Sequence, residues 1–215
     1  MLGLYVTVPI ACFRKGTARE YLESELIPPP STCYGFLLSF VGETDRTKHD
    51  GARVTCGVIG YPFKSVVLRT VWRVKSKPLG SAGNTRPDYQ QLLSNLRLVM
   101  WIDSQQEQSP SSTLESRVSD MLDPKRRSKV ERFGGLSLGE STHLVDEILP
   151  ISVMQDRGIN EEARLFVINE KGRLSLPVWV DHVGSAKSRY TTGDLSKRLA
   201  WTPPSANEIP VISSR

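Results

Sequence analysis

The sequence contains little cysteine and little histidine, and this scarcity argues against a metal site. Its 215 residues include three cysteines, Cys12, Cys33 and Cys56, which share no C-x-x-C spacing, and three histidines that lie at no metal-ligand interval from them. We therefore expect no metal and no cofactor. The few, odd-numbered cysteines fit a reducing compartment such as the cytoplasm, where they usually serve as small core residues.

Long apolar runs are also absent. Residues 1–13, MLGLYVTVPIACF, reach Arg14 before they are long enough to span a membrane, and no basic segment precedes the apolar run. We expect neither a signal peptide nor a transmembrane helix. The chain is long enough to bury a sizeable core, which allows one large domain or one domain with a smaller appendage.

The sequence lacks the common catalytic motifs G-x-S-x-G, H-E-x-x-H and paired carboxylates. From Gly134 to Ser141 the glycine spacing matches a P-loop, but Glu140 occupies the position that requires lysine, and a carboxylate there would repel nucleotide phosphates. The loop is therefore not expected to bind ATP. His143 follows the loop and is the best general-base candidate, although a single histidine at the start of a strand is more often structural.

Hydrophobic periodicity predicts two helices among several strands. The first helix follows IPPPST and is expected to be capped by Ser31 or Thr32. The second, over residues 112–124, is expected to begin with a capping box of Ser112 and Glu115. Strands are predicted over residues 2–8, 53–61, 65–77, 96–103 and 143–153.

This order is the split βαβ pattern of a ferredoxin-like or RRM-like fold enlarged by insertions. We predict an α+β chain with a ferredoxin-like βαββαβ domain over residues 1–155 and a β-rich extension over residues 156–215. In the extension, residues 164–183 are expected to pair as a hairpin whose turn places Gly172 in a left-handed conformation. Residues 202–215, rich in proline and polar side chains, are expected to add no packed element.

The chain is basic, with 28 Lys and Arg against 23 Asp and Glu, a net charge of +5 and an isoelectric point of about 9.2. Alternation in the strand over residues 65–77 predicts one basic face and one packed apolar face that includes Leu68 and Trp72. Like charges on one face repel each other, and a polyanion would relieve the repulsion; a solvated strand face is the alternative. The basic face consists of Arg69, Arg73, Lys75 and Lys77.

A second basic stretch, DPKRRSKVER, leads directly into the glycine-rich loop. Glycine lets backbone N–H groups approach a phosphate without an intervening side chain, so the combination suits a phosphodiester backbone better than a nucleoside triphosphate. A flexible surface loop after a helix is the alternative interpretation. The candidate RNA-binding residues here are Lys125, Arg126, Arg127, Gly134, Gly135, Ser137, Gly139, Ser141 and His143.

Two further segments are candidates for nucleic-acid contacts. A polar insert at about residues 77–95 carries arginine, tyrosine and glutamine, which stack and hydrogen-bond in single-stranded RNA recognition, although it can equally be a decorative hairpin. A smaller basic patch lies near the N-terminus. The residues are Arg86, Tyr89 and Gln90 in the insert, and Arg14, Lys15 and Arg19 in the patch.

Four features occur together: an N-terminal strand, CFR soon after it, PPPSTCYGFLLSFVG at the first helix, and a late GGLSLGESTHLV. Over about residues 1–150 they resemble the CRISPR-associated protein 5 family, most closely its subtype I-B and related forms, within a superfamily of repeat-associated RNA-binding proteins built on RRM-like folds. The resemblance implies a cytoplasmic, non-catalytic subunit of the Cascade surveillance complex that caps the 5′ handle of the CRISPR RNA. The implied partners are CRISPR RNA, the Cascade backbone and large subunits, and nearby target DNA.

The same resemblance suggests a role for the polar insert and leaves one alternative open. The insert lies where a thumb-like hairpin would reach the adjoining backbone subunit. One branch of the family, subtype I-C, cleaves the CRISPR precursor RNA without metal, using a tyrosine, a lysine and a histidine. Tyr21, Lys15 and His49 have these side chains, but no local motif links them. A metal-independent endoribonuclease is therefore the alternative function.

Overall fold

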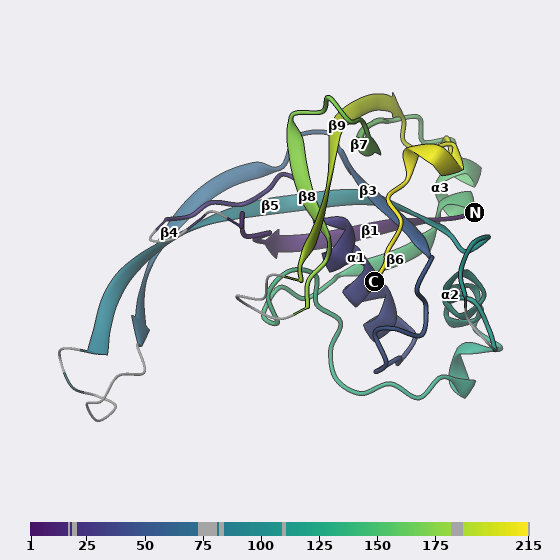
Figure 1. Ribbon diagram of the computed structural model, residues 1–215, viewed down its shortest axis with the longest axis horizontal. Helices are drawn as coiled ribbons and strands as arrows, with labels where there is room; N and C mark the ends of the chain where they lie inside the picture. The colour runs from purple at the N-terminus through teal and green to yellow at the C-terminus, as the bar shows by residue number, and fades with distance from the viewer. Residues whose placement is uncertain are drawn as a thin grey trace.

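The structure is a computed structural model that describes residues 1–16, 18, 21–72, 81, 84–108, 111–181 and 187–214. It consists mostly of one large sheet with a few helices, which confirms the predicted α+β class (Figure 1). The strands are β1 (Leu2–Ala11), β2 (Tyr21–Leu22), β3 (Arg53–Ile59), β4 (Phe63–Trp72), β5 (Thr85–Asp103), β6 (Glu147–Pro150), β7 (Glu162–Ile168), β8 (Leu174–Trp179) and β9 (Arg189–Leu199). The helices are α1 (Pro30–Phe40), α2 (Leu114–Leu122), α3 (Ile151–Asp156) and the 3-10 turns η2 (Arg127–Lys129) and η3 (Ala206–Glu208).

The main path of the sheet has the order β6-β1-β5-β3-β7-β9-β8, and each neighbouring pair is antiparallel. The outer part of β5 also pairs with β4 on one side and with the short β2 on the other. Because β7 pairs with β3, segments before and after the predicted boundary at residue 155 share this sheet. The division into two domains stays a prediction.

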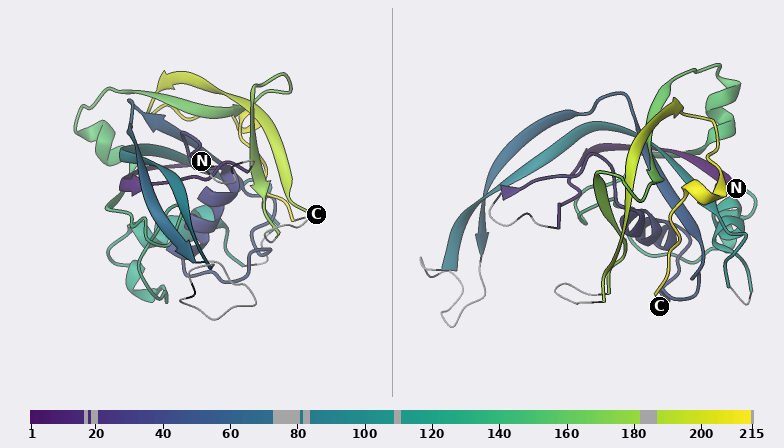
Figure 2. Two further views of the ribbon diagram at one scale, coloured as in Figure 1. Left: turned by 90° about the vertical axis from the view of Figure 1, so that its left-hand side faces the viewer. Right: turned by 45° about the horizontal axis from the view of Figure 1, so that its top comes forward.

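Each face of the sheet buries its own core. In β1, Leu4, Val6 and Val8 point toward α1 and α2, whereas Tyr5 belongs to a second cluster with Trp201 and the residues of α3. The far end of the sheet bends around α1, so that the yellow-green strands descend beside the purple helix (Figure 2). Contact between α1 and β8 closes this curve. Within the described part of the chain, no helix combines the length and the hydropathy needed to cross a membrane.

Helix α1 starts two to three residues earlier than predicted, so the expected cap is wrong. The helix begins at Pro30, which places Ser31 and Thr32 in the first turn, and no side chain caps its N-terminus. Proline is well suited to this position because its missing N–H has no helical partner there. At the other end, Gly42 has a φ of +67°, and a Cβ at this residue would collide with the Glu131 carbonyl.

Helix α2 is present, but its predicted capping box is also wrong. The N-cap is Thr113, whose side chain accepts a hydrogen bond from the Ser116 backbone N–H. This start leaves Ser112 outside the helix. The carboxylate of Glu115 instead accepts a hydrogen bond from the Ser104 backbone N–H at the end of β5, and so joins the helix to the sheet.

Strand pairing in the C-terminal third differs from the predicted hairpin. Strands β7 and β8 do not pair with each other, because β9 lies between them. The connection between them crosses the backbone of Gly193, and Asp194 accepts hydrogen bonds from Asn169 and from the Arg173 backbone N–H. The φ of Gly172 is not in the left-handed region; glycine is needed because a Cβ would collide with Gly193.

Three other predicted segments have different extents from those expected. Residues 143–153 form only the short β6 before α3 begins, and residues 85–95 of the predicted insert belong to the long β5. The expectation for residues 202–215 is wrong, since Ile209 and Ile212 are buried and the Ile212 N–H donates to the Ala52 carbonyl. These two apolar side chains hold the segment against the domain despite its prolines.

Candidate nucleic-acid interface

Strands β4 and β5 form a long hairpin that extends beyond the rest of the molecule, on the side opposite α2 (Figure 1). The residues that connect β4 to β5 are mostly not among those that the structure describes. The positions of the predicted RNA-binding residues Arg73, Lys75 and Lys77, and of Arg19 near the N-terminus, therefore lie outside the description as well.

The described part of β4 does not have the predicted packed face. Leu68 is 62% exposed and lies directly opposite Tyr89, which is 50% exposed and lies next to Tyr21 of β2. These three side chains make a continuous apolar row on one face of the hairpin. Arg69 points to the other face and is only partly exposed.

Arg69 lies near two carboxylates that belong to other segments of the chain, so the sequence of β4 alone does not indicate them. Its guanidinium lies 3.6 Å from an oxygen of Asp88, directly across on β5, and 3.7 Å from an oxygen of Glu140 in the glycine-rich loop. Arg86 lies 4.0 Å from the same Asp88. The predicted repulsion on this face is therefore relieved, at Arg69, by carboxylates from other segments.

Glu140 connects the base of the hairpin to the glycine-rich loop. One oxygen accepts a hydrogen bond from the buried Gln90 amide at 2.7 Å, while the other faces Arg69. The Nε atoms of Arg69 and Arg86, and one oxygen of Asp88, are buried with no hydrogen-bond partner in the described part of the chain. Buried hydrogen-bonding atoms thus remain without partners at the place where the hairpin meets the glycine-rich loop.

His143 fixes the shape of the glycine-rich loop. Its Nδ1 accepts hydrogen bonds from the backbone N–H groups of Cys12 and Glu140, each at 3.2 Å, so this nitrogen carries no proton. Burial lowers the pKa of His143, Glu140 opposes the shift, and Arg69 adds to it. The neutral imidazole joins the loop to the end of β1.

The glycines of the loop have different surroundings. Gly139 has a φ of +100°, and a Cβ there would lie 2.8 Å from the Cys12 carbonyl oxygen, so close packing explains this glycine. Gly134 and Gly135 are exposed. Ser137 pairs with Leu144 through an isolated bridge, and Ser141 is exposed. The exposed glycines remain candidates for close approach by a ligand.

We expect Gly139→Val to lower the free energy of unfolding by about 2 to 3 kcal/mol, because the left-handed backbone and the Cys12 carbonyl both exclude a branched side chain. The matched change Gly135→Val should cost less than about 0.5 kcal/mol, since its nearest neighbour is the mobile end of the Leu144 side chain. Urea unfolding of both variants measures the difference. Equal midpoints would show that Gly139 is not held against β1.

The basic run after α2 is not joined to the hairpin base. Lys125, Arg126 and Arg127 are exposed, and the guanidinium of Arg126 pairs with Asp120 at 2.9 Å and with Asp123 at 3.4 Å. Helix α2, which precedes the run, lies at the end of the molecule opposite the hairpin (Figure 1). These residues therefore form a separate surface.

A cavity of about 480 Å³ lies between the end of β1, the start of α1, the glycine-rich loop and strands β8 and β9. It brings together three of the predicted RNA-binding residues, Arg14, Lys15 and Gly139, and places Glu140 beside them. The remaining lining residues were not predicted as part of a binding site, because no local sequence pattern indicates that they lie close together. The other lining residues are Cys12, Phe13, Gly16, Glu25, Pro29, Ser31, Thr32, Ser175, Pro177, Val180 and Tyr190.

The two cations of the cavity already have partners within the chain. The Lys15 ammonium lies 2.7 Å from the Glu23 carboxylate, and the Arg14 guanidinium donates to the Ala18 carbonyl at 2.9 Å. The Glu25 carboxylate has no hydrogen bond or ion pair within the described ranges. Burial raises the pKa of Glu25, and the nearby Lys15 opposes this shift.

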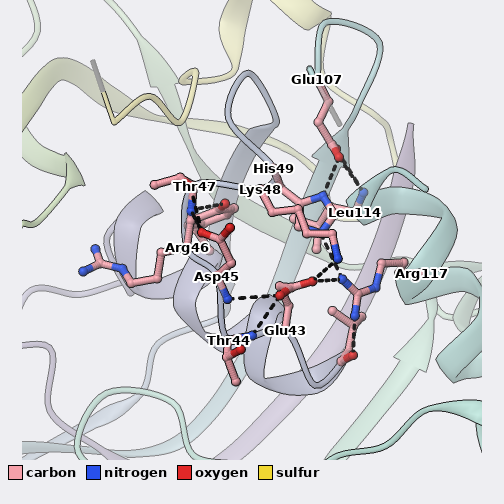
Figure 3. Close-up of polar contacts among 12 residues, drawn as sticks. Glu43, Thr44, Asp45, Arg46, Thr47, Lys48, His49, Glu107, Leu114 and Arg117 are labelled. Atoms are coloured by element: carbon pink, nitrogen blue, oxygen red, sulfur yellow. Dashed lines mark hydrogen bonds and ion pairs between the residues drawn. The ribbon is translucent and has the colours of Figure 1, made fainter. Parts of the chain in front are cut away.

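The three residues considered for RNA cleavage do not converge. His49 is buried, with Nδ1 2.5 Å from a Glu107 oxygen and Nε2 3.2 Å from the Arg117 guanidinium (Figure 3). Lys15 lines the cavity described above, and Tyr21 is 43% exposed at the edge of the hairpin. The partners of His49 thus place it in a separate, buried network.

Comparisons with known proteins find one relative that matches nearly the whole chain and solved structures that share its fold. The chain is 45% identical over 214 residues to the CRISPR-associated protein Cas5 of Myxococcus xanthus (strain DK1622), covering 99% of this chain and 97% of that one. A chain of a CRISPR RNA-guided surveillance complex matches 93% of this chain and 89% of its own length, with a TM-score of 0.58 and 13% identity. A crystal structure of a Cas protein matches 93% and 94%, with a TM-score of 0.50 and 12% identity. No family model matches the chain.

Proposed function

The chain belongs to the CRISPR-associated Cas5 family, and from this we propose that it is a non-catalytic, RNA-binding subunit of a type I Cascade complex in the cytoplasm. In this proposal it caps the 5′ handle of the CRISPR RNA and contacts the adjoining backbone and large subunits close to the target DNA. The cavity carries the proposal, because it joins basic side chains, a glycine-rich loop and the base of the hairpin. The subtype stays a prediction.

The strand order supports assigning the core to the ferredoxin-like, RRM-like class. Strands β6-β1-β5-β3 lie side by side, with α1 between β1 and β3 in sequence and α2 between β5 and β6, as in a βαββαβ unit. RRM domains stack bases on aromatic residues of the open sheet face. Here Tyr5 and Trp101 on that face are buried against Ile151, Met154 and Trp201. This covering favours the cavity over the sheet face as the RNA site.

The proposal is tested with the full chain and a labelled RNA of the CRISPR repeat in EDTA. We expect a shifted band and no cleavage product. Replacing Arg14 and Lys15 by alanine should weaken binding and reduce the log-log salt slope by about 0.7 for each phosphate that is no longer neutralised. The matched control replaces Arg157 and Lys171, which are exposed, lie outside the cavity and are not among the predicted RNA-binding residues, and should bind as wild type does.

Each alternative gives a different result in this assay. A cleavage product formed in EDTA would favour the metal-independent endoribonuclease and contradict the non-catalytic role. Absence of a shifted band at low salt would overturn the proposed RNA binding. Equally weakened binding in the cavity variant and the control variant would mean that binding is spread over the basic surface.

A further inference from the structure

The walls of the cavity suit a nucleobase better than a phosphate group. Its apolar surface comes from Phe13, Pro29, Pro177, Val180 and Tyr190. Its polar groups include hydroxyls, two carboxylates and the cations Arg14 and Lys15, which already contact the Ala18 carbonyl and Glu23. A carboxylate repels a phosphate but accepts hydrogen bonds from the edge of a base. The volume of about 480 Å³ is within the usual range for small-molecule pockets. A base turned out of a single strand has the matching shape, with flat apolar faces and a polar edge.

Glu25 differs from the other charged groups of the cavity. Lys15 contacts Glu23, and Glu140 contacts Gln90 and Arg69. The carboxylate of Glu25 has no such partner among the described residues, although its backbone is fixed on both sides. Its N–H donates to the Phe13 carbonyl at 2.7 Å, and its carbonyl accepts from the Ser24 hydroxyl at 2.8 Å.

An unpartnered carboxylate in a partly buried site favours a ligand that donates hydrogen bonds. Burial raises the pKa of Glu25, because the charged form is less well solvated there than in water. A donor group from a ligand would relieve this cost, since buried polar groups are unfavourable unless they are hydrogen-bonded. The nearby Lys15 ammonium does not donate to Glu25, because it already pairs with Glu23.

We propose that Glu25 reads the edge of one unpaired base of the bound RNA and selects a base with an amino group, guanine above the others. This inference rests on the proposed function. Guanine presents an N1–H and an N2 amino group side by side, which match the two oxygens of one carboxylate. Adenine and cytosine offer a single amino group, and the N3–H of uracil lies between two carbonyl oxygens that a carboxylate repels.

The test measures binding of the full chain to handle RNAs in which one unpaired position at a time carries guanine, inosine, adenine, cytosine or uracil. Inosine lacks only the N2 amino group of guanine. For wild type we expect one position at which uracil binds about 5- to 150-fold more weakly than guanine, with inosine in between. Glu25→Gln, which keeps the shape of the side chain, should reduce these differences to within about twofold. The matched control Glu170→Gln makes the same charge change at an exposed residue outside the cavity and should retain the guanine preference.

The outcomes separate this inference from the function on which it rests. If wild type binds no handle RNA, the proposed function fails. If wild type binds but shows no base preference at any position, or if Glu25→Gln keeps that preference, only base reading by Glu25 is overturned. The comparison of guanine with inosine uses the wild-type protein, so the test remains decisive even if the variant is unstable.

Discussion

Replacing Arg117 by methionine is expected to lower the free energy of unfolding by about 2 to 4 kcal/mol, because it removes one of the two cations that contact the buried Glu43 carboxylate. The guanidinium of Arg117 contacts Glu43, whose side chain is only 9% exposed, and donates to the Val41 carbonyl at 2.9 Å. It also lies 3.2 Å from Nε2 of His49 (Figure 3). One side chain therefore holds α2 to the segment that follows α1.

The effect is large because the network continues beyond this pair. Glu107, which contacts His49, also accepts a hydrogen bond from the Leu114 N–H at 2.9 Å, at the first residue of α2. Since Nε2 of His49 faces a permanent donor, this nitrogen accepts, and Nδ1 donates the hydrogen bond to Glu107. Removal of Arg117 would free one end of a chain of contacts in which each member orients the next.

Urea unfolding measures the change, with Arg126→Met as the matched control. Arg126 also pairs with a carboxylate of α2, at 2.9 Å, but its side chain is 64% exposed, and exposed pairs contribute less than about 1 kcal/mol. A decrease of under about 1 kcal/mol for Arg117→Met would show that the buried network does not stabilise the fold.

The same variant should change the acid sensitivity of the protein. Burial alone would raise the pKa of Glu43, but hydrogen bonds from Lys48, the Asp45 N–H and Arg117 outweigh it and lower the pKa to about 2. A folded-state pKa below the unfolded value stabilises the protein above about pH 4.5, and this stability is lost as the pH falls toward 2. We expect the stability of Arg117→Met to vary less with pH between 5 and 2 than that of wild type.

Local sequence patterns predicted the strands whose two faces have different surroundings. They did not predict strand pairing where the neighbouring strand comes from a distant segment of the chain. Alternation predicted β1 because Leu4 and Val6 must face the helices while other residues face away. Nothing in residues 164–183 indicates that β9 will lie between β7 and β8. The pairing is decided by Gly193 and Asp194, which are about twenty residues away in sequence.

In the candidate site, too, some residues could be predicted from the local sequence and others only from the fold. Arg14, Lys15 and Gly139 were found because charge and glycine are local signals. Glu25 and Tyr190 carry no such signal; they reach the cavity through the fold. The basic face of β4 was overestimated for a related reason, since the carboxylate opposite Arg69 belongs to β5 and follows from strand register alone.

Replacing residues 70–87 by an Asn-Gly turn is expected to abolish incorporation into Cascade while leaving the chain folded and able to bind handle RNA. The turn would join Arg69 to Asp88, which already lie opposite each other on β4 and β5. The pairing of β2 with Tyr89 and Gln90, and the Gln90–Glu140 hydrogen bond, lie on the retained side. The ends of β4 and β5 that would be removed lie away from the helices and the two cores (Figure 1).

Capture of the backbone subunit on the shortened chain measures assembly, and RNA affinity and melting temperature are measured on the same preparation. Under the proposed thumb-like role, capture falls to background, while RNA binding through the untouched cavity persists. The affinity should fall only by the phosphate contacts of the removed Arg73, Lys75, Lys77 and Arg86. Normal capture would show that the hairpin is not the contact with the backbone subunit. Unfolding would assign residues 70–87 to the core.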